Sequence, residues 1–239
     1  MKNYPAVVPQ ESAWHRYRRV VSGQEGVSKF LFEQVVLGLF SQLPGPLGLA
    51  LRRLFFPFVL YRFGKNAMID RSVDIRCPSR VQLGLGCFIE SYVQILAGST
   101  NQPSIVLEDG AYVRSFSILN AGAPDGFIKI GRKSNLAHHV VVHGHGGVII
   151  GNDVMIASGC SLVASMHIHV DSTKPISQQG FTASGIRLGD GVWLGAGVKV
   201  LDGVSIGQRS IVGAGSVVIE DIPDNTVSAG VPAQVKHFR

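Results

Sequence analysis

The chain has 239 residues, of which 46% are apolar and 16% are charged, a balance that supports a folded core and excludes a disordered chain. The formal net charge is +6, and much of the excess lies in the first 80 residues, in WHRYRR, LRRLFF and YRFGKN. A basic end of this kind either meets anionic lipids or phosphates or is simply solvated. The three cysteines form no CxxC pair, so nothing requires an oxidising compartment.

The N-terminal region, residues 1–64, is apolar and basic and predicts two short helices at 27–43 and 46–62. Its opening stretch, MKNYPAVVPQESAWHRYRR, lacks the apolar segment of a cleaved secretory signal, so we expect a cytoplasmic protein. The longest run without a charge, residues 34–51, is broken by Pro44 and Pro46. Because a spanning helix needs about 20 apolar residues in succession, we predict no transmembrane segment.

Two placements of these helices are open at this stage. Their apolar faces and basic rim would suit a peripheral position on a membrane surface. They would equally suit packing against the rest of the protein or against a neighbouring subunit. We favour packing and keep membrane contact as the alternative.

From residue 65 to residue 239 a six-residue rhythm dominates, and it is clearest from Ile186 onward. One column of inward residues is Leu188, Leu194, Val200, Ile206, Val212 and Val218, and a second is Ile186, Val192, Val198, Val204, Ser210 and Ser216. A fixed short period predicts a solenoid, in which each coil buries its inward residues against the coils above and below it. We therefore predict an all-β solenoid domain for residues 65–239.

The repeat, the stretch VWLGAGV and the ending DIPDNTVSAGVPAQV resemble the hexapeptide-repeat acyltransferases, over roughly residues 67–236. Within that family the sequence is most similar to the sugar O-acetyltransferases of surface-polysaccharide synthesis. The resemblance implies a three-sided, left-handed parallel β-helix that assembles as a homotrimer. It also implies transfer of an acetyl group from acetyl-CoA to a sugar hydroxyl of a capsule, exopolysaccharide or lipopolysaccharide precursor. Neither a metal nor a nucleic-acid partner is expected.

Three segments interrupt the repeat and read as turns that protrude from the coils, at 98–104, 121–127 and 166–184. The third, MHIHVDSTKPISQQGFTAS, is the longest and contains two histidines. Loops held by a rigid scaffold commonly carry function. We therefore expect the site in this segment.

Acyl transfer to a hydroxyl needs a base for the hydroxyl proton and hydrogen-bond donors for the oxyanion that forms. Histidine suits the first task because it titrates near neutral pH. The resemblance places the catalytic histidine at His167, sixteen residues beyond Gly151 of the hexapeptide IGNDVMI. It leaves His169, His145 and His143 as acceptor-binding residues.

For the acyl donor, the resemblance implies coenzyme contacts from Trp193, Ala196 and Ala214, the two alanines acting through their backbone. One departure concerns Glu220, which stands where related sugar acetyltransferases often carry a lysine that approaches the coenzyme phosphates. Lys236 or Arg239 would then have to supply that contact.

Two rival functions stay open. The H-x-H pairs at 143–145 and 167–169 would also suit a β-helix carbonic-anhydrase-like zinc enzyme, because histidine is a common zinc ligand. A solenoid can also serve only for assembly, since fold does not fix function. The histidine-bearing segment argues against the second alternative.

Overall fold

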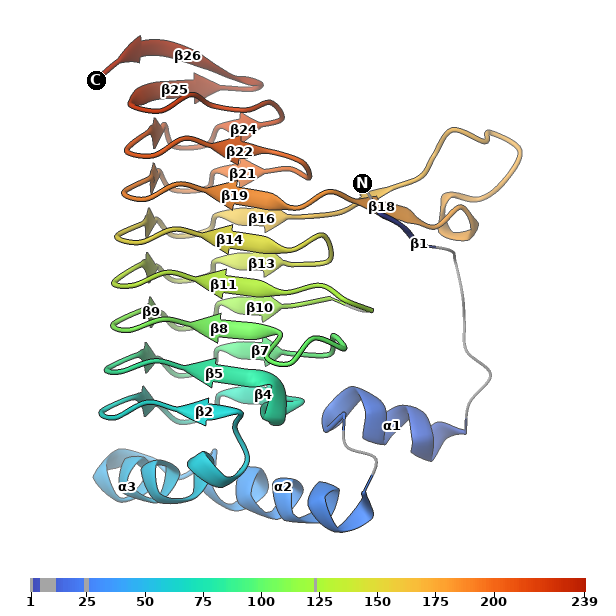
Figure 1. Ribbon diagram of the computed structural model, residues 1–239, viewed down its shortest axis with the longest axis vertical. Coiled ribbons are helices and arrows are strands. Elements are labelled where there is room, and N and C mark those ends of the chain that lie inside the picture. Colours follow the sequence, from blue (N-terminus) through green and yellow to red (C-terminus); the bar gives the residue numbers. More distant parts are fainter. Residues whose placement is uncertain (1, 5–11, 24–25, 123) are drawn as a thin grey trace.

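The structure, a computed structural model, describes residues 2–4, 12–23, 26–122 and 124–239. Its main body is a column of stacked coils, with helices gathered at one end (Figure 1). Each coil gives one short strand to each of three sheets, which we call the first, second and third faces in chain order. The predicted parallel β-solenoid with a helical N-terminal region is thereby confirmed.

The three faces are built as follows. The first face contains β2 (Arg62–Phe63), β5 (Val81–Leu83), β8 (Ile105–Leu107), β11 (Ile128–Ile130), β14 (Val148–Ile150), β19 (Ile186–Leu188) and β22 (Ser205–Ile206). The second face contains β3 (Met68–Ile69), β6 (Phe88–Ile89), β9 (Tyr112–Val113), β12 (Asn135–Leu136), β15 (Met155–Ile156), β20 (Trp193–Leu194), β23 (Ile211–Val212), β25 (Thr226–Gly230) and β26 (Ala233–Phe238). The third face contains β4 (Asp74–Arg76), β7 (Gln94–Leu96), β10 (Ile118–Asn120), β13 (Val141–His143), β16 (Ser161–Val163), β21 (Lys199–Val200) and β24 (Val217–Val218). Neighbouring strands are parallel, and the chain closes the column with an antiparallel pair, β25 and β26.

The core is the set of columns that the sequence predicts. Every member of the two columns that begin at Ile186 and Leu188 is buried. The two serines of the second column are buried as well, and their hydroxyls donate to backbone carbonyls: Ser210 to Pro223 and Ser216 to Gly213. Buried polar groups are tolerated when they are hydrogen-bonded in this way.

Glycine often stands directly after a residue of the column that begins at Leu188, because successive coils approach one another closely at that position. A Cβ atom at Gly195 would lie 2.6 Å from the backbone nitrogen of Ala214 in the next coil. Only a residue without a side chain fits this separation, which explains why the repeat carries glycine immediately after an inward aliphatic residue.

The helical end differs in detail from the sequence prediction. It contains α1 (Ala13–Val21), α2 (Val27–Phe40) and α3 (Gly45–Phe55), followed by the 3-10 turn η1 (Phe56–Phe58). Helix α1 was not predicted, and both predicted helices end earlier than expected. The second helix is shorter because Pro57 interrupts it, and residues 62–63 already form the first strand of the solenoid.

Packing of the helices is one-sided. Helix α2 buries Phe30 and Val36, and α3 buries Gly48 and Arg52, but each helix also leaves several large apolar side chains exposed. Packing therefore accounts for only half of their apolar surface. Within the described part of the chain, no helix has the length and apolar content that crossing a membrane requires.

Arg52 fastens the helices to the first coil. Its side chain is 1% exposed, and its Nε donates to the carbonyl of Ile69 at 2.8 Å. Its Nη1 donates to the carbonyls of Phe40 and Leu43 at 2.9 and 2.7 Å. One guanidinium therefore joins the end of α2, the following turn and the strand β3. Hydrogen bonds to a charged donor are the stronger kind.

We predict that Arg52→Met lowers the free energy of unfolding by about 3 kcal/mol, because it removes the side-chain donor of one buried and two partly buried carbonyls. Urea denaturation followed by circular dichroism measures this loss. The matched control is Arg53→Met, at an exposed neighbouring position, where we expect almost no change. Equal stability of the two variants would contradict the role given to Arg52.

Candidate functional site

All three interruptions of the repeat leave the column at the same corner. Residues 98–104 lie between β7 and β8, residues 121–127 between β10 and β11, and residues 166–184 between β16 and β19. Each therefore connects the third face to the first. Position 123 lies outside the described residues. In Figure 1 these segments protrude from one side of the column and form a wall, which the short turn between β13 and β14 interrupts.

The longest interruption forms a β-hairpin. Ile149 pairs with Arg187, 38 positions later, whereas Arg187 pairs with Ser205, 18 positions later, so this coil carries an insertion longer than a whole coil. Inside it, β17 (Met166–His167) pairs antiparallel with β18 (Phe181–Ala183), and the 3-10 turn η3 (Ile176–Gln178) lies between them.

The N-terminal strand β1 (Lys2–Tyr4) completes this hairpin. It pairs antiparallel with β18, in a three-stranded sheet of order β1, β18, β17. The side chains of Lys2 and Tyr4 also contact the carboxylate of Asp125 in the second interruption. The N-terminus thus ties two of the three loops together, far from the helices that follow it in the chain (Figure 1).

Two of the four predicted histidines contact one aromatic ring, and a third lies beside one of them. The ring centre of Phe181 lies 5.4 Å from that of His145 and 6.4 Å from that of His167. The rings of His143 and His145 are 6.4 Å apart. On its other side Phe181 stacks against Tyr4, with ring centres 4.7 Å apart. The structure therefore brings together His143 and His145, from the end of β13 and the turn that follows it, and His167 from the hairpin.

His169 lies elsewhere in the arrangement. Its Nδ1 lies 3.0 Å from the carbonyl oxygen of His167, and its side chain is exposed. It can steady the backbone of His167 rather than face the other rings.

The two coil histidines are held in their neutral form. Burial lowers the pKa of His143, whose Nδ1 lies 3.4 Å from the amide nitrogen of Asn120. Burial also lowers the pKa of His145, and the neighbouring charges of His143 and His167 lower it further. The Nδ1 of His145 is buried and has no hydrogen-bond partner among the described residues. A buried nitrogen without a partner disfavours the charged ring.

The zinc alternative needs three ligands that point at one place. Among the residues that the structure describes, no three histidine, cysteine, aspartate or glutamate side chains are arranged to hold a metal ion. His145 and His167 instead contact the apolar ring of Phe181.

The predicted donor residues occupy a different corner. Trp193 lies in β20 on the second face, and Ala196 and Ala214 follow β20 and β23 at the corner between the second and third faces. All three are exposed. The two alanines lie in successive coils, and neither amide donates a hydrogen bond to any residue that the structure describes. Both amides are therefore available to a ligand.

A column of glycines at this second corner is a feature that the sequence analysis missed. Gly159, Gly197 and Gly215 stack in successive coils, and a Cβ at Gly197 or Gly215 would meet no atom within 4 Å. In the coils below, stacked rings fill the same column, with centres 5.1 Å apart for Tyr92 and Phe116. Aromatic rings thus fill this corner in the lower coils, whereas Gly159, Gly197 and Gly215 leave it open beside the two alanines. We call the open part the shelf. The sequence could have revealed this open corner, because the residue at one position of the repeat changes from aromatic to glycine along the chain.

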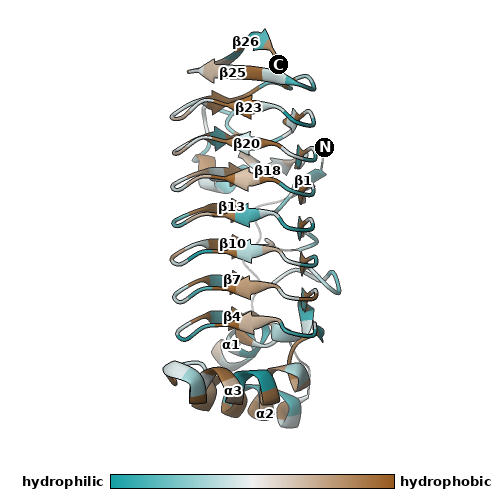
Figure 2. Ribbon diagram, turned by 90° about the vertical axis from the view of Figure 1, so that its left-hand side faces the viewer, coloured by the Kyte–Doolittle hydropathy of each residue, from teal (hydrophilic) through white to brown (hydrophobic). Residues whose placement is uncertain are grey.

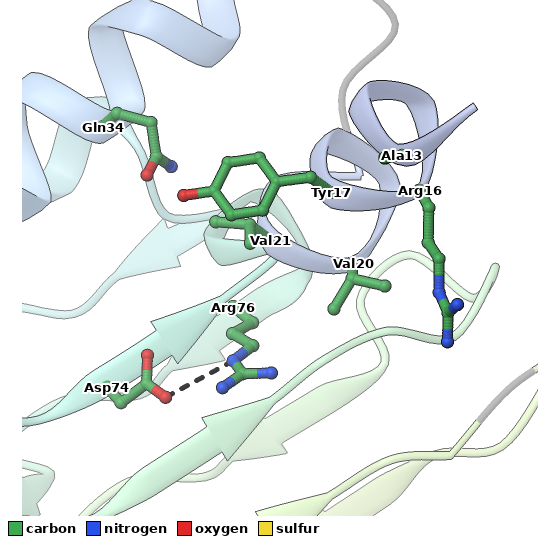
Figure 3. Close-up of a pocket in the computed structure, with 8 residues that line it drawn as sticks. All are labelled: Ala13, Arg16, Tyr17, Val20, Val21, Gln34, Asp74 and Arg76. Atoms are coloured by element: carbon green, nitrogen blue, oxygen red, sulfur yellow. Dashed lines mark ion pairs between the residues drawn. The ribbon is translucent and has the colours of Figure 1, made fainter.

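Tyr4 and Phe181 were also missed, because neither belongs to the repeat or carries an obvious chemical motif. A separate hollow lies between α1, α2 and β4, lined by Ala13, Arg16, Tyr17, Val20, Val21, Gln34, Asp74 and Arg76 (Figure 3). Asp74 and Arg76 form an ion pair of 3.4 Å on its floor. None of the predicted site residues lines this hollow.

Known proteins share the repeat and the fold. The family description "Bacterial transferase hexapeptide (six repeats)" matches residues 185–220. The chain is 38% identical over 109 residues to the galactoside O-acetyltransferase of Escherichia coli K12, covering 45% of this chain and 52% of that protein. It is 40% identical over 95 residues to a putative lipopolysaccharide biosynthesis O-acetyl transferase of the same strain, covering 37% and 48%. The resemblance to the hexapeptide-repeat acyltransferases is confirmed.

The chain spans about half the length of the curated relatives it matches. Among solved structures, it is similar to the N-acyltransferase AntD of Bacillus cereus, determined in complex with dTDP and 3-hydroxybutyryl-CoA. The TM-score is 0.52 at 20% identity, with 79% of this chain and 88% of that chain covered. At this identity the similarity shows the fold alone.

We predict that Gly122→Ala displaces His145. A Cβ at Gly122 would lie 2.6 Å from Cγ of His145, whereas a Cβ at Gly110 would lie 3.5 Å from the flexible side chain of Lys133. Both glycines have positive φ, 78° and 71°, so Gly110→Ala is the matched control for backbone strain. Displacement removes the burial that lowers the pKa of His145, which should rise toward its ordinary value of about 6.5.

Proton NMR titration of the histidine rings measures this change. In the unaltered protein, His145 should titrate below about 6.5, and in Gly122→Ala at a higher pH. Gly110→Ala should leave the titration where it was. A His145 titration that is the same in all three proteins would show that Gly122 does not set the position of the ring.

Proposed function

We propose that the protein is an O-acetyltransferase that moves the acetyl group of acetyl-CoA to a sugar hydroxyl of a surface-polysaccharide precursor. The observation that carries the proposal is the contact of His145 and His167 with Phe181, with His143 beside His145, at the corner where the loops protrude. The relatives named as galactoside and lipopolysaccharide O-acetyl transferases support the acceptor class. The CoA ester in the AntD complex supports the donor class.

In this proposal His167 is the general base. Its side chain is exposed, so an acceptor can reach it, and β17 fixes its backbone through pairing with β18. His145 is less accessible, because it is half-buried against Gly122 and Phe181. His143 and His145, both neutral, line the acceptor side, and His169 positions the backbone of His167.

The reaction proceeds by direct transfer. The imidazole of His167 takes the hydroxyl proton as the sugar oxygen attacks the thioester carbonyl, and the carbonyl oxygen becomes an oxyanion. The amide of Ala196 donates to that oxyanion. Collapse of the intermediate breaks the carbon–sulfur bond and releases the coenzyme thiolate, which takes the proton back from His167. A preorganised amide is suited to this role because it does not reorganise during the reaction.

The donor site is completed by a second copy of the chain. Ala196 and the histidine corner lie at opposite edges of the third face, and six residues of extended chain span roughly 20 Å. A base must come within about 3 Å of the proton that it takes. Within one chain this separation is too large, so we infer that Trp193, Ala196 and Ala214 of one copy face the histidines of its neighbour in a homotrimer. The coenzyme arm then lies on the shelf of Gly159, Gly197 and Gly215.

We predict that His167→Ala lowers kcat by about 10²–10⁴-fold, the range expected for the loss of a general base. Acetyl-CoA binding, measured by calorimetry, should persist, because the proposed donor contacts are mostly backbone. His169→Ala is the comparison variant and should lower kcat much less than His167→Ala, because it loosens the backbone of His167 but leaves the base in place. A panel of nucleotide-linked and lipid-linked sugars serves as acceptor. Turnover that survives in His167→Ala but is lost in His169→Ala would move the base to His169.

We also predict that two inactive variants restore each other. Ala196→Trp should block the donor shelf, and His167→Ala should remove the base, so neither forms a working site alone. Mixed trimers of the two contain some interfaces at which both residues are intact, and part of the activity should return. Light scattering should show a trimer for each variant. Trimers that stay inactive on mixing would place the donor and acceptor sites within one chain.

A further inference from the structure

The helical end of the molecule presents a large exposed apolar surface, which we call the cap face. Its side chains belong to α2, α3 and η1, and each is roughly half exposed or more: Val27, Leu31, Phe32, Val35, Leu39, Leu47, Leu54 and Phe58. In Figure 2 apolar colour covers much of α2 and α3 at the foot of the column. Monomeric soluble proteins rarely expose apolar patches of this extent, and such patches mark interaction sites.

The spacing shows that the cap face is a continuous helix surface. On α2 the exposed residues Leu31, Val35 and Leu39 recur every four positions, and on α3 the exposed Leu47 and Leu54 are seven positions apart. Positions with these separations lie on one side of a helix. An ordinary surface helix has a polar outer side, whereas α2 and α3 are apolar on the outer side as well as the inner side.

The exposed charge of the helical segment is basic, and the carboxylates of the first coil beside it, Asp70 and Asp74, pair with Arg52 and Arg76. Across the described residues 12–23 and 26–66, the basic side chains are His15, Arg16, Arg18, Arg19, Lys29, Arg52, Arg53, Arg62 and Lys65. In these ranges the acidic side chain is Glu33, which is 4% exposed. The exposed charge is therefore cationic. A protein partner would need its own apolar surface with an acidic rim, whereas an anionic bilayer supplies both an apolar layer and anionic headgroups.

The cap face is also presented in a fixed direction. Arg52 and the stacking of Phe40 on Phe55, with ring centres 4.5 Å apart, hold α2 and α3 together against the first coil. The helices lie across the end of the column, away from the histidine corner (Figure 1). Helices of this length and composition lie in the membrane interface with one apolar side buried and basic residues at the headgroups.

We propose that the cap face docks the protein on the surface of an anionic membrane, with the outer sides of α2 and α3 inserted among the headgroups. The docking does not depend on the proposed acetyl transfer, because its residues and the histidine corner lie at different places in the fold. The placement that the sequence analysis favours, packing against protein, describes the inner sides of the helices.

Vesicle flotation of the full-length protein tests the proposal. The protein should float with vesicles of phosphatidylcholine and phosphatidylglycerol, and much less with phosphatidylcholine alone. Added salt should weaken the binding, because it screens the attraction between exposed charges. Alkaline carbonate should release the protein, since no helix of the described chain is long and apolar enough to span the bilayer.

Two sets of variants separate the apolar and charged contributions. Leu31→Ser and Leu54→Ser should each lower vesicle partitioning by about tenfold, whereas Ile219→Ser, at an exposed apolar residue of the solenoid, should leave it unchanged. Lys29→Glu and Arg53→Glu should each lower it by at least about fivefold, and Lys199→Glu is the control on the solenoid. All these positions are exposed, and thermal melts check that the variants remain folded.

The outcomes distinguish the possible occupants. Failure of the unaltered protein to float with anionic vesicles would overturn the proposal. So would assemblies larger than a trimer that Leu31→Ser and Leu54→Ser dissociate, because the cap face would then meet a second copy. Acetyl transfer to a soluble acceptor should be the same in Leu54→Ser as in the unaltered protein, so loss of docking and loss of the proposed activity are separable.

Discussion

The stacking of inward aliphatic side chains at a constant period is the constraint on which the rest of the molecule depends. Each coil pairs with its neighbours through short parallel strands, so a coil has little stability by itself and the column acts as a unit. The separation of successive coils is fixed by backbone hydrogen bonding, and it leaves no room for a side chain at positions such as Gly195. A frame of this rigidity can hold loops at defined heights along one edge.

The three loops that form the candidate site all leave the solenoid at one corner. Because every insertion occurs at the corner between the third and first faces, segments far apart in the sequence lie side by side, and backbone hydrogen bonds such as Thr100 to Pro124 at 2.7 Å connect them. The N-terminal strand β1 then pairs with β18 of the longest loop and contacts Asp125 of the second loop. Tyr4 reaches Phe181 and Asp125 together, so the position of the histidines depends on the first residues of the chain. The site is thus assembled from the first residues of the sequence and its middle.

The opposite end of the column meets a different physical requirement. A solenoid must cover its terminal coil, and α2 and α3 do so with their inner sides, fixed by the buried guanidinium of Arg52. Covering the coil uses only one side of each helix. The apolar outer side has no structural role in the chain, and its basic surroundings match an anionic bilayer. The same two helices therefore serve as the lid of the solenoid and, in our proposal, as its membrane contact.

The sequence by itself determined the solenoid, because a six-residue period is a local property that every coil repeats. It also located the three insertions, since they break that period, and it singled out His143, His145 and His167 before their proximity was known. It could not place them at one corner, because their meeting depends on how many residues fill each coil between insertions. It gave no sign of Tyr4 or Phe181, whose importance comes from a strand pairing between residues 2–4 and 181–183. Nor could it decide which sides of α2 and α3 are covered, because both sides are apolar in the sequence and only the packing against the first coil distinguishes them.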